Sequence, residues 1–392
     1  MQNLYYLQNT AMNYDWGSPS LIPELMGESN PENKPIAEIW IGAHDKAPSL
    51  ADAGGSTIKL NELISQSPEE LAGKQGRLPF LMKLLAAEKP LSVQAHPAAE
   101  FAKVGFEKEN TADVALDAPE RNYRDPYEKR ELLLALTPFT ALCGFRKPGE
   151  IHRLLSMTAP VSFAPELELL KKRDIKSLVK RMLSMNKSEA KLLIREFTAS
   201  ASSRIGTTHE AYPMCFDLLE HHPTDTAALM PMLLNIVRLQ PGESLYVHPR
   251  QLHLYIEGMG VEVMTASDNV VRAGLTSKHV DVNELLNIGD FISVDTEPLQ
   301  PRVEGCCKVY APENAGGSLR LLDVTPSGPE TFTVDHEGSP LLMLCVKGAG
   351  TVSFAGGDSF AIKTGQSAFV PAAAPQFTLA GNGRIFVFTG ES

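Results

Sequence analysis

The chain has 392 residues, of which 43% are apolar and 21% are charged, and its formal net charge is −11. This length exceeds what one ordinary core can organise, so we expect two or three domains of globular composition. The negative charge disfavours nucleic acid and anionic membranes as partners, because both require clustered Lys and Arg. It does not disfavour a small anionic substrate, which needs only a local basic pocket.

The beginning of the chain and its cysteines indicate a cytoplasmic protein. The first residues, MQNLYYLQNTAMNYDWGS, lack the basic and apolar regions of a secretory signal, and no apolar run reaches membrane-spanning length. The five cysteines are sparse and odd in number, and no CxxC occurs. This usage is typical of reduced thiols rather than of a disulfide framework.

Residues 1–146 mix short strand patterns with turns. The stretches IAEIWIGAH (36–44) and PLSVQAHP (90–97) are predicted strands because of their alternation and their content of β-formers. The stretch SPEEL (67–71) predicts a helix start, with Ser67 and Glu70 as a capping box and Pro68 at the first helical position.

Residues 147–233 change to helical spacing. Stretches such as DIKSLVKRMLSM and KSEAKLLIREFTA carry apolar residues three and four positions apart, and Asn186 followed by Glu189 marks another helix start. We interpret this segment as a helical domain inserted between β-rich regions.

Strand patterns return at 234–317, where PGES is a predicted turn between two strands, and from 318 to 392 the chain reads as short strands with Gly-rich turns. The latter pattern is typical of a small antiparallel barrel or jelly roll. The predicted fold class is therefore mainly β with an inserted helical domain. Its expected parts are a discontinuous barrel (1–146 plus 234–317), the helical domain (147–233) and a C-terminal small β-barrel (318–392).

The stretch LSVQAHP (91–97) carries three polar side chains in strict alternation. Successive residues of a strand face opposite sides, so Ser92, Gln94 and His96 share one face while their apolar neighbours face the core. A Gln-x-His pair can offer two donor atoms to one metal ion, with imidazole suited to Zn²⁺. Alternation alone permits a solvated strand face as well as a metal site.

Two further stretches could complete such a site. Lys129 and Glu131 share a face at the start of the apolar strand LLLAL, and a buried carboxylate there needs either a metal or a salt bridge. The segment YVHPRQLHLYIEG (246–258) offers His248, which is followed by a proline, and His253, which lies between apolar residues and is better placed to point inward. A single core histidine is the commoner explanation of such a position.

The stretch MTASDNVVRAGLTSKHVD (264–281) is polar and turn-rich and carries Arg272 and Lys278. We expect a loop that either supplies positive charge to a phosphate or is an ordinary surface loop. Phosphate-binding GxxxxGK[ST] and strand-linked GxGxxG patterns are absent, and so is GxSxG, which disfavours kinases, dehydrogenases and serine hydrolases.

Together these motifs resemble the type I mannose-6-phosphate isomerases. The matching stretches occur in family order over roughly residues 13–281. They are NYDWG (13–17), AEIWIGAH (37–44), LPFLMKLL (78–85), LSVQAHP (91–97), GFEKEN (105–110), ERNYRDP (120–126) and SDNVVRAGLTSKHVD (267–281). The resemblance implies a cupin-type fold, with a catalytic barrel, an inserted helical domain and a second barrel.

The resemblance also implies one Zn²⁺ per chain, with Gln94, His96, Glu131 and His253 as ligands. Arg272 matches the family's active-site arginine, and Ser92, Lys129 and Lys278 match positions that line its substrate pocket. Where the family commonly reads HKPEL, this chain reads EKREL (128–132), so the family's histidine has no counterpart here.

The implied activity is the interconversion of mannose 6-phosphate and fructose 6-phosphate through an enediol. Zn²⁺ would polarise substrate oxygens, and Arg272 would stabilise the developing charge. The sequence does not identify the general base. The candidates are a carboxylate, Lys129, a zinc-bound water and His44. The alternatives are a related cupin isomerase or epimerase acting on another phosphosugar, and a non-catalytic sugar-binding cupin. We expect a monomer whose partner is a small phosphosugar.

Overall fold

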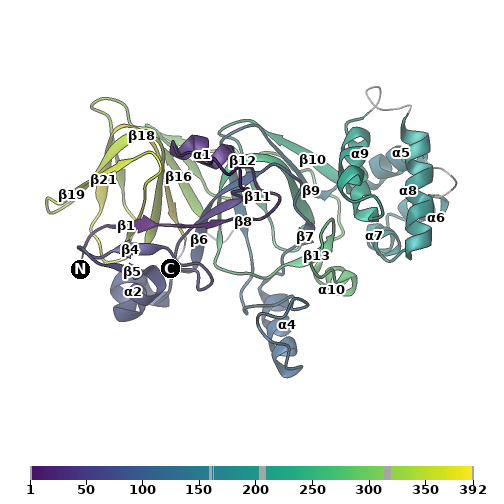
Figure 1. Cartoon of the computed structure of the whole chain (residues 1–392), viewed down its shortest axis with the longest axis horizontal. Coiled ribbons are helices and arrows are strands. Elements are labelled where there is room, and N and C mark those ends of the chain that lie inside the picture. Colours follow the sequence, from purple (N-terminus) through teal and green to yellow (C-terminus); the bar gives the residue numbers. More distant parts are fainter. Residues whose placement is uncertain (1, 159–160, 162, 203–208, 313–318, 391–392) are drawn as a thin grey trace.

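The computed structural model describes residues 2–158, 161, 163–202, 209–312 and 319–390. In Figure 1 three parts follow one another along the long axis: a β-barrel built mainly from the end of the chain, a second β-barrel in the middle, and a block of helices. The predicted fold class, mainly β with an inserted helical domain, is confirmed. No helix in the described ranges is long and apolar enough to span a bilayer.

The middle barrel is a ten-stranded antiparallel sheet with the main order β10-β9-β12-β6-β3-β2. Strand β8 lies between β11 and β12, and β7 lies between β12 and β13. The strands are β2 (Thr10–Met12), β3 (Glu38–Ile41), β6 (Phe80–Ala87), β7 (Val93–Ala95), β8 (Glu131–Ala135), β9 (Phe139–Phe145), β10 (Leu234–Leu239), β11 (Ser244–Val247), β12 (His253–Thr265) and β13 (Val271–Gly274).

Strand β12 is the centre of this sheet because it changes partners half-way. Its first residues pair with β9 and β7, and its later residues pair with β6 and β8. The change occurs at Gly258, whose φ is +118° and where a Cβ would lie 2.6 Å from the carbonyl oxygen of Pro138. Only glycine combines this backbone angle with so close an approach. The bend allows one strand to line two sides of the barrel.

The segment 264–281 differs from the prediction of a loop. Its residues Val271–Gly274 form β13, which pairs antiparallel with β7 and sets Arg272 directly opposite Gln94. The prediction was wrong for these four residues because a four-residue strand has no room to show a period. It was also wrong for Met264 and Thr265, which are the last residues of β12. The other residues of the segment are bends and irregular backbone, as expected.

The helical block lies where the sequence places it. Asn186 is the N-cap residue of α8 and forms a complete capping box. Its side chain accepts hydrogen bonds from the backbone amides of Ser188 and Glu189, and its own backbone amide donates to the side chain of Glu189. The inner faces of these helices share one apolar core with the middle barrel, including Val93 and Leu254. The elements are α5 (Pro148–Ser156), α6 (Ala164–Lys171), α7 (Ile175–Leu183), α8 (Lys187–Ala201), α9 (Ala211–His221) and the 3₁₀ helix η3 (Thr226–Met232).

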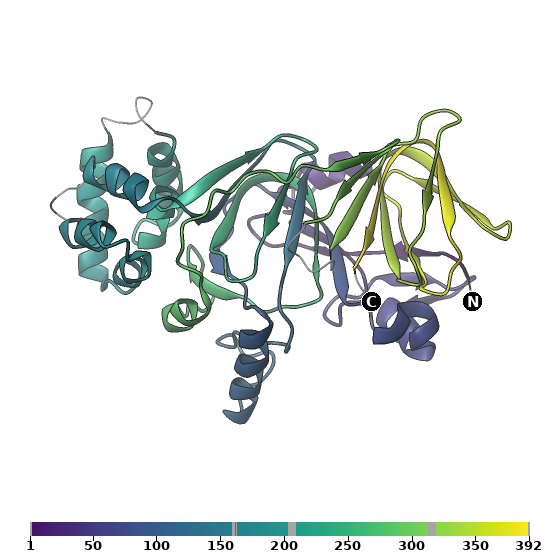
Figure 2. The ribbon, with the colours of Figure 1, turned by 180° about the vertical axis from the view of Figure 1, so that it is seen from behind.

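The second sheet has eleven strands in the main order β14-β15-β16-β21-β18-β20-β1-β4-β5, with β17 on β21 and β19 on β18. The strands are β1 (Tyr5–Gln8), β4 (Leu50–Asp52), β5 (Thr57–Lys59), β14 (Arg302–Glu304), β15 (Cys307–Tyr310), β16 (Arg320–Val324), β17 (Thr331–Val334), β18 (Leu341–Phe354), β19 (Ser359–Lys363), β20 (Ser367–Val370) and β21 (Phe377–Thr389). Seen from behind, the purple N-terminal strand runs beside the yellow-green barrel (Figure 2).

These pairings cross the expected domain boundaries. Strand β1 joins β20, and β14 and β15 continue the same sheet, although all three lie in the segments we assigned to the other barrel. The division into 1–146 plus 234–317, 147–233 and 318–392 stays a prediction. Strands from both ends of the chain are thus hydrogen-bonded to each other in one sheet.

The described residues contain further helices outside the helical block: α1 (Leu21–Met26), α2 (Leu60–Gln66), α3 (Pro68–Ala72), η1 (Gly73–Gln75), α4 (Ala99–Thr111) and α10 (Val282–Ile288). Helix α4 projects from the middle barrel (Figure 1). Pro68 is the first residue of α3, as predicted, but the predicted capping box is wrong because Ser67 makes no side-chain cap. Its ψ of 68° departs from the extended geometry that cap residues usually adopt.

Candidate metal centre

Three strands of the middle barrel bring two histidines and a glutamate together. His96 directly follows β7, Glu131 begins β8 and His253 begins β12. Because His253 is the register partner of Gln94 on β7, these chain positions meet at one end of the barrel. One ligand atom from each of His96, Glu131 and His253 lies within 4.8 Å of the others, and all three residues are 1–2% exposed.

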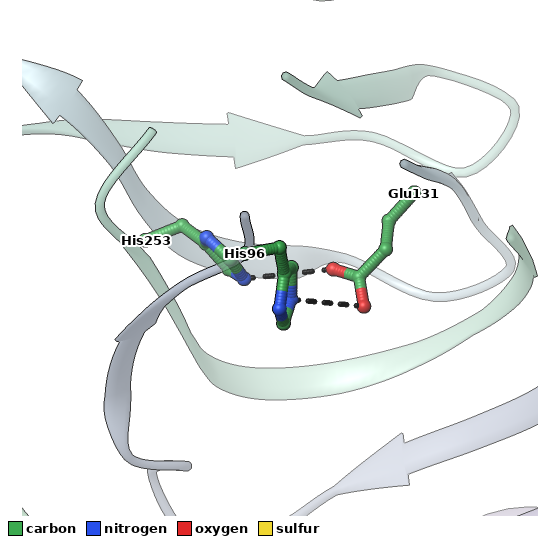
Figure 3. A group of neighbouring side chains, drawn as sticks. All are labelled: His96, Glu131 and His253. Carbon is green, nitrogen blue, oxygen red and sulfur yellow. Dashed lines mark ion pairs between the residues drawn. The ribbon is translucent and has the colours of Figure 1, made fainter. Parts of the chain in front are cut away.

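The carboxylate of Glu131 faces both imidazole rings and forms one ion pair with each (Figure 3). His96 Nε2 is 3.2 Å from Glu131 Oε1, and His253 Nε2 is 3.5 Å from Glu131 Oε2. The ring centroids of the two histidines are 4.9 Å apart. All three groups therefore direct their polar atoms at the same small space.

Backbone carbonyls fix which nitrogen of each histidine is available. His96 Nδ1 lies 2.9 Å from the carbonyl oxygen of Asn269, and His253 Nδ1 lies 3.0 Å from that of Gln251. A carbonyl oxygen can only accept, so in both rings Nδ1 carries the proton and donates it. In the neutral rings, both Nε2 lone pairs then face the carboxylate.

This donor set fits a divalent metal ion. Among the described residues, the buried atoms His96 Nε2 and Glu131 Oε2 have no hydrogen-bond partner. A nitrogen lone pair and a carboxylate oxygen repel each other unless a cation lies close to both. Two imidazoles oriented by carbonyls, together with a carboxylate, are the usual ligand chemistry for Zn²⁺.

Burial and Lys129 set the charges of the cluster. Burial and the nearby Lys129 ammonium lower the pKa of His96 to about 3, which favours its neutral, metal-binding form. Burial by itself would raise the pKa of Glu131, but Lys129 and His96 hold that pKa well below its usual range. Lys129 Nζ lies 2.9 Å from Glu131 Oε1, so the predicted shared face of these two residues is present.

Gln94 lies beside the cluster with its amide nitrogen toward His253. Gln94 Nε2 is 3.4 Å from His253 Nε2, while Gln94 Oε1 accepts a hydrogen bond of 3.2 Å from Ser92 Oγ. An amide coordinates a metal through its oxygen, so a ligand role for Gln94 requires its amide to turn over. Ser92 is thereby placed next to the cluster through Gln94.

The predicted basic residues lie on the same side of the barrel. Arg272 is the cross-strand partner of Gln94, and directly opposed residues of an antiparallel pair project on the same face. Burial and the neighbouring Arg124 lower the pKa of Arg272. Lys278 is exposed, and the charge of Arg272 contributes to lowering its pKa, after burial.

His44 is placed by an acidic partner rather than by the cluster. Its Nε2 lies 3.4 Å from Asp268 Oδ2, and its ring meets Trp40 edge-on with centroids 4.9 Å apart.

His248, the alternative to His253, lies on the outer side of the barrel against Tyr246, with centroids 4.4 Å apart. It lines a cavity of about 890 Å³ that contains none of the predicted ligands.

A buried charge network was missed by the sequence reasoning. Lys83 Nζ lies 3.3 Å from Glu38 Oε1 and 3.1 Å from Glu262 Oε2, and Tyr255 and Trp40 donate to the two carboxylates. The charge of Glu131 contributes to raising the pKa of Lys83, so the network lies within electrostatic reach of the cluster. A signal was present, because Lys83 and Glu262 each interrupt an apolar strand sequence.

Asn269 was also missed. Its side chain is fully buried and connects the backbone of residues 124–127, while its own carbonyl holds His96. A lone asparagine in a polar stretch carries no signal that distinguishes it from its neighbours, so only the folded chain shows this role.

Comparisons with known proteins agree with this geometry. The family profile "Phosphomannose isomerase type I, catalytic domain" matches residues 4–148, and "Mannose-6-phosphate isomerase, cupin domain" matches residues 321–389. The mannose-6-phosphate isomerase of Escherichia coli (strain K12) is 35% identical over 97% of both chains. Mannose-6-phosphate isomerase 1 of Arabidopsis thaliana is 31% identical over 95% of this chain and 90% of its own.

The chain belongs to the mannose-6-phosphate isomerase family. Among solved structures, a mannose 6-phosphate isomerase from Salmonella typhimurium bound to fructose 6-phosphate and zinc is similar over the full length of both chains. Its TM-score is 0.91 and its sequence identity is 31%. The resemblance and the cupin-type fold expected from the motifs are thus confirmed.

Proposed function

We propose that this chain interconverts mannose 6-phosphate and fructose 6-phosphate and that it holds one Zn²⁺ for the purpose. The observation that carries the proposal is the convergence of His96, Glu131 and His253, with both Nε2 atoms turned inward by backbone hydrogen bonds. The family membership, together with the zinc and the sugar phosphate in the solved relative, supports the choice of metal and substrate.

Gln94, His96, Glu131 and His253 would hold the metal. When bound, zinc would act as a Lewis acid on the substrate's carbonyl and hydroxyl oxygens and thus favour loss of the adjacent C–H proton. The carbonyls of Asn269 and Gln251 keep the two imidazoles in the required tautomer. Lys129 keeps Glu131 ionised at neutral pH.

The substrate would bind on the side of the cluster where Arg272 projects. An aldose–ketose isomerisation moves a proton between C2 and C1, and negative charge develops on the enediol oxygens. Arg272 would stabilise that charge, since a guanidinium beside a partly buried site is a fixed cation that needs no reorganisation. Ser92 and Lys129 would contact the sugar, and Lys278 would contact the phosphate.

The base that moves the proton must lie close to the reacting carbons. Lys129 is the sequence candidate that touches the metal cluster, whereas His44 is oriented by Asp268. A pH–rate profile of Lys129→Met against that of His44→Gln separates them. The variant that lacks the base should lose the limb of the profile that reports the base.

A coupled assay for fructose 6-phosphate, run on zinc-loaded protein with mannose 6-phosphate, tests the function directly. The matched variant is His253→Ala, which should lose both zinc and turnover. If the wild-type protein binds zinc but does not turn over mannose 6-phosphate, the proposal is wrong. Turnover of a different phosphosugar would favour a related isomerase or epimerase, and binding without turnover would favour a sugar-binding cupin.

We further propose that the enzyme acts as a monomer in the cytoplasm. All five cysteines are free thiols, which supports a reducing compartment. Light scattering after gel filtration would test the oligomeric state, and a mass of two chains would overturn this part of the proposal.

A further inference from the structure

Three cations from two segments of the chain gather near the metal cluster. Lys46 follows β3, Arg272 lies on β13 and Lys278 lies in the turn after it. Burial is the largest cause that lowers the pKa of Lys278, and the charges of Arg272 and Lys46 come next, which places the three groups within reach of one another. Among the residues that the structure describes, none of the three forms an ion pair within 4.0 Å, although the charges of Glu38 and Asp15 act on Lys278 and partly offset the lowering of its pKa.

Tyr14 lies in the middle of this group. Its ring stacks on Trp16 with centroids 5.7 Å apart and an interplanar angle of 23°. The ammonium of Lys278 lies 5.1 Å from the centroid of the Tyr14 ring, and Lys46 Nζ lies 3.5 Å from the Tyr14 hydroxyl oxygen. The Tyr14 side chain therefore contacts Lys278 through its ring and Lys46 through its hydroxyl group.

The contacts restrain side chains that would otherwise be free. Lys46 and Lys278 are exposed, and a lysine loses roughly 2 kcal/mol of side-chain entropy when it is fixed. The Tyr14 ring beside the Lys278 ammonium and the Tyr14 hydroxyl beside the Lys46 ammonium restrain both lysines before an anion binds. The entropy cost of fixing them on binding is therefore smaller. Lys46 is held on a second side by Trp40, whose ring centroid lies 5.5 Å from Nζ.

We propose that Tyr14 is a positioning residue for the phosphate of the substrate, and that Lys46 joins Lys278 in binding this dianion. The inference rests on the proposed function, because it assumes a phosphosugar. Two ammonium groups held by one tyrosine side chain suit a group with two negative charges. Tyr14 itself makes no contact with the reacting carbons in this role, so it should affect binding and not the chemical step.

Two substitutions separate its contacts. Tyr14→Phe removes only the hydroxyl that meets Lys46, and Tyr14→Leu removes the ring as well. We expect the KM for mannose 6-phosphate and the inhibition constant of inorganic phosphate to rise together, by about 2- to 3-fold for Phe and about 5- to 10-fold for Leu. The kcat should stay within about 2-fold, because the transition-state contacts are retained. Zinc content should be unchanged.

The decisive readout is a double-mutant cycle. In a Lys46→Met background, Tyr14→Phe should have no further effect on either constant, because the hydroxyl acts through Lys46. Tyr6→Phe is the matched control, since its hydroxyl bonds to the carbonyl of Ala361 in the other barrel and should leave both constants unchanged.

Several results would overturn the inference: unchanged constants in Tyr14→Leu, a loss confined to kcat, a loss of zinc, or equal effects of Tyr14→Phe in both backgrounds. Calorimetric titration of the zinc-loaded protein with inorganic phosphate measures the same effects without turnover. If the wild-type protein does not isomerise mannose 6-phosphate but the phosphate affinities still follow the cycle, the proposed function fails and the phosphate site stands.

Discussion

Replacing Asn269 by alanine should weaken the fold and the metal site together. The side chain accepts from the amides of Arg124 and Asp125, at 2.7 and 3.2 Å, through Oδ1. Through Nδ2 it donates to the carbonyl oxygens of Asp125 and Tyr127, both at 2.8 Å, and to Asp125 Oδ1 at 3.2 Å. Five contacts from one fully buried amide thus close the loop 124–127 onto the barrel.

The magnitude follows from these contacts. A net hydrogen bond is worth about 1 kcal/mol, and buried groups left unpaired cost more, so Asn269→Ala should lower the free energy of unfolding by about 3–5 kcal/mol. The carbonyl of Asn269 also holds His96, so movement of the loop should weaken zinc binding by about 10-fold or more. Asn269→Asp should not restore stability, since it directs a carboxylate oxygen at the carbonyls of Asp125 and Tyr127.

Urea unfolding of chelator-treated protein measures the stability, and competition with a chromophoric chelator measures the zinc affinity. Asn287→Ala is the control, because this exposed asparagine makes one hydrogen bond, to Glu284, on α10. A loss below about 1 kcal/mol for Asn269→Ala, or stability loss with unchanged zinc affinity, would refute the argument that this amide supports the metal centre.

Three further predictions follow from the barrel interior. Arg272→Lys keeps the charge but loses the planar fork, so kcat should fall about 10²- to 10³-fold with a smaller change in KM, as steady-state kinetics would show. Lys83→Met leaves Glu38 and Glu262 buried without their cation and should cost about 3–5 kcal/mol in urea unfolding; equal stability of the variant would contradict this. Gly258→Ala forces a Cβ against the backbone at a positive φ and should lower the melting temperature by several degrees, about 1–3 kcal/mol; an unchanged melting temperature would argue against the strained bend.

Sequence patterns predicted those parts of the fold that depend on interactions between residues close together in the chain. Apolar residues at helical spacing predicted the helical block, and the Asn186 capping box is present because cap chemistry acts within one turn. The same chemistry failed at Ser67, where the end of α2 immediately before α3 imposes another backbone angle. Strand β13 was missed because its pairing with β7, and not its own sequence, makes it a strand.

The candidate site was predictable only in part, because its residues come from distant segments of the chain. Alternation along LSVQAHP correctly placed Gln94 and His96 on one side, but whether that side was a solvated surface depended on residues far away in the chain. The structure brings Glu131 and His253 to the same point, and the full ligand set stays a prediction. Asn269 and Tyr14 could not be assigned, since their importance lies in contacts that no spacing rule describes.

The departure from the family pattern at EKREL (128–132) lies in the residues just before β8. Glu131 and Lys129 face the metal cluster, and on the neighbouring strand Val247 is the register partner of Glu131. Arg130 belongs to the opposite side and pairs with Glu128, with 2.6 Å between Arg130 Nη2 and Glu128 Oε1. The two residues that differ from the family therefore neutralise each other. An acidic and a basic residue stand where the family commonly has His and Pro, while Lys129 and Glu131 are kept, so the departure is compatible with the proposed metal centre.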